Sequence, residues 1–142
     1  TWLVKPGARP RRSPRRNDIY ALFDELVSIP TLLDHPNLTI EVLLVTVERH
    51  QVADPRLSRG RGGWRTVDRC LREIHSRQPF EVVSDLARLV PDGLTPGFTT
   101  RDLARSAGIT VDRAQKMAYC LRANDLFEVV GRDRAGYRYQ LL

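Results

Sequence analysis

Cysteine and long apolar runs are scarce in this sequence. It has two cysteines in 142 residues, and Cys70 and Cys120 are too far apart to form a CxxC metal motif and too few for a disulfide framework. The uncharged apolar run at 42–47 is far shorter than the roughly 20 residues of a membrane span. No charged-then-apolar signal segment opens the chain. We therefore expect a cytoplasmic protein with no membrane association.

The motifs of common enzyme classes are also missing. The glycines of residues 60–63 are not followed by the Lys-Ser/Thr of a phosphate loop, there is no GxSxG, and no histidine has HExxH spacing. Glu25, Glu41 and Glu48 follow a helix–strand pattern like that of restriction-endonuclease-like nucleases, but no lysine accompanies Glu48. We predict no enzyme, cofactor or metal site, with an inactive or divergent nuclease-like unit at 18–78 as a third alternative.

Positive charge is abundant and arranged in blocks. The chain has 23 lysines and arginines against 17 acids, a net charge of +6. Residues 1–16 contain six bases and no acid, residues 17–48 six acids and no base, and residues 49–72 seven arginines against two acids. Such blocks are typical of a protein with basic stripes that binds a phosphate-rich partner. The alternative is that acidic helices neutralise the basic segments within the fold.

The first half of the chain reads as an arm, a helix and a strand. Residues 1–4 are predicted to be extended, and residues 5–16 to form an extended arm because they contain three prolines and six bases. Apolar residues at helical spacing from Ile19 to Val27 predict a helix that begins at Asn17-Asp18 and ends at Pro30. The β-branched residues of 39–47 predict a strand.

A basic loop, a second strand and a second helix are expected next. Residues 52–63 are predicted to be a flexible loop, residues 64–74 a strand that returns against 39–47, and residues 80–90 a helix that ends before Pro91. Trp64 is either a core anchor or a group that stacks on nucleic acid. The candidate phosphate contacts in the arm, the loop and the returning strand are Arg11, Arg12, Arg15, Arg16, Arg59, Arg61 and Arg65.

Residues 98–141 have the strongest pattern in the chain. Capping threonines and a glycine predict two short helices, 101–107 and 111–123, joined at Gly108. Two strands, 126–130 and 137–141, are predicted to follow as a hairpin with a basic turn.

This pattern resembles the winged helix-turn-helix superfamily, with Phe98-Thr-Thr opening the motif, Asp102-Leu-Ala in the first helix of the pair and the hairpin as the wing. The resemblance covers about 45 of the 142 residues, and the helix at 80–90 supplies the usual first helix. It implies that the helix 111–123 lies in the major groove of DNA and that the basic wing, 131–138, contacts the backbone. The residues that it implicates are Thr99, Thr100, Arg113, Gln115, Lys116, Tyr119, Arg122, Arg132, Arg134 and Arg138.

We therefore predict an α+β protein with a basic arm (1–17), a small mixed α/β unit (18–78) and, packed against that unit, a winged helix (79–142). The expected partner is double-stranded DNA, with RNA as a lesser possibility. The alternative is a protein-interaction or scaffolding domain that binds a protein partner or further domains of its own polypeptide. DNA binding of the predicted form requires Arg113 and Lys116 to be exposed beside the wing arginines, and burial against residues 18–78 would contradict it.

Overall fold

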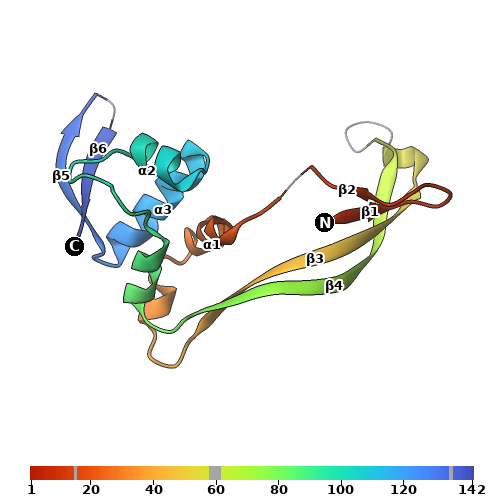
Figure 1. The fold of residues 1–142 in the computed structure, drawn as a ribbon, viewed down its shortest axis with the longest axis horizontal. Helices are drawn as coiled ribbons and strands as arrows, with labels where there is room; N and C mark the ends of the chain where they lie inside the picture. Colours follow the sequence, from red (N-terminus) through yellow and green to blue (C-terminus); the bar gives the residue numbers. More distant parts are fainter. Residues whose placement is uncertain (15, 58–61, 135) are drawn as a thin grey trace. The chain divides into compact units, whose positions relative to one another are not determined.

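The computed structural model describes residues 1–14, 16–57, 62–134 and 136–142, and the predicted α+β class is confirmed (Figure 1). No helix in these ranges is long and apolar enough to cross a bilayer. With η denoting a 3₁₀-helix, the elements are β1 (Trp2–Val4), β2 (Arg11–Arg12), η1 (Ile19–Ala21), α1 (Leu22–Leu26), η2 (Leu32–Asp34), β3 (Ile40–Ala53), η3 (Pro55–Leu57), β4 (Trp64–Phe80), η4 (Val83–Leu89), α2 (Thr100–Ala107), α3 (Val111–Ala123), β5 (Phe127–Asp133) and β6 (Gly136–Leu141).

The chain divides into two compact units. The sheet unit consists of Thr1–Asp18 and Leu43–Gln78, and the helical unit consists of Ile19–Val42 and Pro79–Leu142. Residues from Pro79 onward lie in the helical unit. Residues 19–42, by contrast, were expected to belong with the strands but group with the C-terminal residues. Their apolar side chains explain this, because Phe23, Leu26 and Leu33 are buried in the core of the helical unit.

The sheet unit contains a four-stranded sheet in the order β2-β1-β3-β4. β1 is antiparallel to β2 and parallel to β3. β3 and β4 lie side by side (Figure 1), and the side-chain contacts Gln51–Thr66 and Thr46–His75 indicate that they are antiparallel. The predicted strands at 39–47 and 64–74 are therefore confirmed, and both are longer than the β-branched runs that predicted them.

The prediction of an extended arm at the N-terminus is wrong for the described residues before Ser13. β1 and β2 form a hairpin whose turn includes Gly7, at a positive φ of 70°. Two cation–π contacts help to hold this hairpin, with the Arg12 guanidinium 5.2 Å from the Trp2 ring centre and Lys5 Nζ 3.8 Å from that of Trp64. Proline and arginine content therefore did not prevent these residues from joining the sheet.

Two predicted helices are shorter or tighter than expected. α1 contains five residues, and neither Asn17 nor Asp18 is its N-cap, which is Ala21. The segment at 80–90 forms the 3₁₀-helix η4 rather than an α-helix. The Asp85 carboxylate accepts hydrogen bonds from the backbone amides of Glu81 and Val82 at 2.8 and 3.2 Å, and such side-chain bonds compete with α-helical pairing.

The helical unit has a continuous hydrophobic core. α2, α3 and the β5–β6 hairpin match the predicted elements closely, and α3 buries one face consisting of Ala114, Met117, Ala118, Cys120 and Leu121. That face packs with residues of α1, η4 and β5 in a single cluster. In the sheet unit, none of the described residues is buried.

Truncation of Phe23, which is fully buried, should therefore destabilise the helical unit. We expect Phe23→Ala to lower the free energy of unfolding by about 3–5 kcal/mol, because it removes a large core side chain and leaves a cavity. Val67→Ala is the control, since Val67 is 49% exposed, and it should change stability by less than about 0.5 kcal/mol. Urea denaturation of both variants tests this, and similar losses in the two would contradict the assignment of α1 to the core.

Candidate nucleic-acid interface

The pair of helices in the helical unit is fixed by caps that the sequence encodes. At the start of α2, the Thr99 amide and hydroxyl donate to Asp102 Oδ2 at 2.9 and 2.7 Å, and the Asp102 amide donates back to Thr99 Oγ1 at 3.3 Å. Gly108 ends the helix in the left-handed conformation, which glycine adopts without steric cost. Thr110 caps α3 by accepting a hydrogen bond from the Arg113 amide at 3.2 Å.

The cap of α2 changes the expectation for Thr99 and Thr100 as phosphate contacts. The hydrogen bonds from Thr99 lower the pKa of Asp102, so its carboxylate stays charged at the helix N-terminus. That negative charge occupies the end of the helix where a phosphate would otherwise be favoured. The Thr99 hydroxyl, moreover, is already engaged with Asp102.

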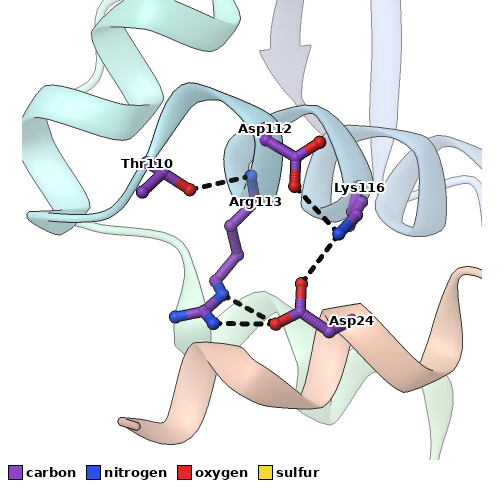
Figure 2. Close-up of polar contacts among 5 residues, drawn as sticks. All are labelled: Asp24, Thr110, Asp112, Arg113 and Lys116. Atoms are coloured by element: carbon purple, nitrogen blue, oxygen red, sulfur yellow. Dashed lines mark hydrogen bonds and ion pairs between the residues drawn. The ribbon is translucent and has the colours of Figure 1, made fainter. Parts of the chain in front are cut away.

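Two of the predicted base-reading side chains on α3 contact α1 instead. Arg113 donates from two nitrogens to Asp24 Oδ2, at 3.1 and 2.7 Å, and Lys116 Nζ lies 3.1 Å from Asp24 Oδ1 (Figure 2). Lys116 also pairs with Asp112 at 2.8 Å. The side chains of Arg113 and Lys116 are 20% and 32% exposed. The prediction that both are displayed on one open basic surface is therefore wrong, because Asp24, a residue of the 18–78 segment, holds them.

The electrostatics of this Asp24 cluster (Asp24, Asp112, Arg113 and Lys116) follow from its contacts. The hydrogen bond from Arg113 is the main cause that lowers the pKa of Asp24, against a smaller effect of burial. Asp112 and Asp24 raise the pKa of Lys116. These contacts thus favour the charged forms of Asp24 and Lys116, and the two acidic side chains of the cluster face its two basic ones.

The outer face of α3 remains available. Gln115, Tyr119 and Arg122 are exposed and recur at spacings of four and three residues, which places them along one stripe of the helix. Tyr119 is 46% exposed. These three were all predicted as site residues.

The hairpin is joined to the rest of the unit by backbone and aromatic contacts. Tyr139 exchanges backbone hydrogen bonds with Gly97 and Phe98, both at 2.8 Å. The rings of Phe98, Phe127 and Tyr139 lie 5.2–6.1 Å apart and form part of the core. This packing fixes the orientation of the two strands relative to α3.

The arginines of the hairpin have different environments. Arg138 donates to the Gly97 carbonyl at 3.0 Å and pairs with Asp133 at 2.5 Å, so it supports the hairpin itself. Arg132 and Arg134 are exposed. The guanidinium groups of Arg132 and Arg122 lie 5.1 and 5.8 Å from the ring centre of Tyr137.

The structure thus brings Arg122 of α3 and Arg132 of β5 to the same tyrosine. Sequence reasoning missed Tyr137, whose signal was its alternation with the buried Tyr139 in the last strand. It also missed Asp24 as the partner of Arg113 and Lys116. The only pointer to Asp24 was the general expectation that acidic helices neutralise bases, which does not select one acid.

The remaining candidate phosphate contacts lie in the sheet unit. Arg11, Arg12 and Arg16 are exposed, while Arg65 pairs with Asp54 at 3.4 Å. Arg15, Arg59 and Arg61 lie outside the described residues.

Few arrangements in the structure suggest catalysis. Over the described ranges, no group of three or more His, Cys, Asp or Glu side chains is placed to hold a metal ion. Glu48, of the nuclease-like pattern, contacts Arg72 at 2.8 Å and His50 at 3.4 Å. Burial raises the pKa of Cys120 to about 11, and the neighbouring Asp68 raises that of Cys70, so neither thiol is activated as a nucleophile.

Comparison with known proteins places this chain in a family. The profile of a domain of unknown function, DUF8091, matches residues 5–81, more than half of the chain. The chain belongs to this family. The matched range covers β2, α1, β3 and β4 and ends before η4, so that α2, α3 and the β5–β6 hairpin lie beyond it.

A relative matches a larger share of the chain. An uncharacterized protein of Treponema pallidum (strain Nichols) is 29% identical over 99 residues, which is 68% of this chain and 38% of that protein. The chain therefore matches well under half of the relative's length. No solved structure matches significantly.

Replacing Asp24 by asparagine should destabilise the helical unit in a pH-dependent manner. We expect Asp24→Asn to lower the free energy of unfolding by about 1 kcal/mol at pH 7, because partly exposed, charge-assisted hydrogen bonds are lost. The pKa of Asp24 is lowered in the folded protein, so its contribution is complete above the ordinary carboxyl pKa and is lost as the pH falls through the folded value. The difference from wild type should close as the pH falls below the ordinary Asp pKa of about 3.9.

Urea unfolding across this pH range measures the effect. Glu25→Gln is the matched control, since Glu25 lies in the same helix and is exposed. A stability difference for Asp24→Asn that does not change with pH would contradict an ionic role for Asp24.

Proposed function

We propose that the helical unit is a winged helix-turn-helix that binds double-stranded DNA, with α3 as the recognition helix and the β5–β6 hairpin as the wing. The observation that carries the proposal is the cluster of Arg122, Arg132 and Tyr137, which joins the exposed stripe of α3 to the hairpin. Two cations and an aromatic ring at this junction suit contacts with phosphate and sugar.

The contact residues differ from the sequence-based set. Gln115 offers an amide that suits adenine, and Tyr119 offers a hydroxyl and a ring, so both fit base contacts in the major groove. Arg122, Arg132 and Arg134 would contact the backbone. Arg113 and Lys116 are assigned to the Asp24 cluster and take no direct part.

A protein-interaction role is the second candidate, and charge favours it. The helical unit contains nine lysines and arginines against twelve acids, whereas the sheet unit contains fourteen against five. A net charge of −3 weakens non-specific attraction to DNA. If this role is correct, the stripe on α3 docks a protein and duplex DNA has no measurable effect on it.

Fluorescence anisotropy of a labelled duplex at several salt concentrations tests the DNA proposal. Arg122→Ala/Arg132→Ala should weaken binding by about tenfold or more and reduce the slope of log K against log salt by about 1.8, since two phosphate contacts are lost. Arg88→Ala/Arg105→Ala removes the same charge from the same unit, at residues that pair with Asp85 and Asp102. This control should change the affinity by no more than about twofold. Equal effects of the two double variants would reject the proposed interface.

A further inference from the structure

The sheet unit combines a large positive charge with the absence of a buried core. Its fourteen lysines and arginines exceed its five acids by nine, and thirteen of the fourteen are arginine. None of its described residues is buried. Like charges at this density repel one another and favour an anionic partner, and arginine is the side chain best suited to bidentate contact with phosphate.

The strand register assigns these charges to two faces of the sheet. Trp2 lies opposite Arg12 on β2 and Glu48 on β3, whereas Leu3 lies opposite Arg11 and Arg49. Residues directly opposite each other project from the same face, and successive residues project from opposite faces. We call the two sides the Trp2 face and the Leu3 face.

The charges of the Trp2 face are satisfied within the unit. The Arg12 guanidinium lies over the Trp2 ring. Glu48 contacts both Arg72, at 2.8 Å, and His50, at 3.4 Å. On this face, Glu48 therefore compensates the charge of Arg72, and Arg12 is engaged by the Trp2 ring.

On β1, β2 and β3, the Leu3 face lacks such compensation. On β3 its positions from 43 to 53 are occupied by Leu, Val, Val, Arg, Gln and Ala, with no acid. Within the described ranges, neither Arg11 nor Arg49 forms an ion pair. These two guanidinium groups flank Leu3 from the strands on either side of it.

We propose that the Leu3 face binds the phosphate backbone of double-stranded nucleic acid through Arg11 and Arg49. This site is separate from the one proposed on the helical unit, and it would supply affinity without sequence selection, as backbone contacts do. A two-stranded ribbon such as β3–β4 also has a width that the major groove admits. The partner is nucleic acid rather than a protein because the positions of this face on β1, β2 and β3 offer cations without acids.

Matched variants on the two faces test this proposal. Arg11→Ala/Arg49→Ala and Arg12→Ala/Arg72→Ala each remove two positive charges from the same unit, but from opposite faces. In anisotropy titrations of the full chain with a labelled duplex, the first variant should weaken binding by about tenfold or more and reduce the salt slope by about 1.8. The second should change the affinity by no more than about twofold, and Arg11→Lys/Arg49→Lys should recover most of the loss. Circular dichroism verifies that each variant is folded.

The outcomes separate this proposal from the proposed function. Weaker binding in Arg11→Ala/Arg49→Ala, together with unchanged binding in Arg122→Ala/Arg132→Ala, supports the Leu3 face and rejects the interface on the helical unit. The reverse result rejects the Leu3 face alone. Equal losses on the two faces of the sheet would overturn the proposal by showing that only net charge matters. So would a loss of binding to phosphatidylserine vesicles with duplex binding unchanged, since the face would then recognise a membrane surface.

Discussion

The organisation of the helical unit depends on the attachment of α1 to α3, whose apolar part is the shared core and whose polar part is the Asp24 carboxylate. This carboxylate lies on α1, far from α3 in the sequence, yet it accepts hydrogen bonds from both Arg113 and Lys116. The helix α1 therefore brings a negatively charged side chain to the face of α3 that borders the core. The buried side chains of Phe23 and Leu26 on the same helix provide the apolar part of this attachment. The ion pairs are formed because this packing of α1 places Asp24 beside Arg113 and Lys116.

The regular elements of the second half were predictable because local signals agree there. Thr99, Thr110 and Gly108 mark the ends of α2 and α3, and their caps form as their residue types suggest. The first half was harder. Its N-terminal hairpin depends on pairing between β1 and β3, which are more than thirty residues apart, and no local pattern encodes such a contact. The proline and arginine content of residues 5–16 shows that this segment does not form a core by itself. It does not show whether the segment pairs with a distant strand.

The candidate site was only partly predictable, for a related reason. Spacing along α3 identifies which residues avoid the core of its own helix pair, and it correctly leaves Gln115, Tyr119 and Arg122 exposed. Spacing does not identify a third helix that covers part of the polar face. The side chains of Arg113 and Lys116 were expected to be exposed to solvent because α1 was expected to belong to another unit. Once residues 19–42 are placed in the helical unit, the same residues become the natural partners of Asp24.

The two proposed sites lie on units of opposite net charge, and they would therefore contribute differently to binding. Backbone affinity grows with the number of phosphates neutralised, while selectivity needs side chains that meet base edges. The helical unit has a net charge of −3 and would gain little from non-specific attraction to DNA. Under the proposal, its amide and hydroxyl groups on α3 would contribute mainly where the bases suit them. The sheet unit has the opposite character, with an excess of arginine and, on the Leu3 face, two cations without an acid on the facing positions of β3. If both proposed sites bind, such a chain would separate attraction from discrimination. A weakly attractive reading surface would dissociate readily from unsuitable sequences, while the basic face would keep the protein near the nucleic acid.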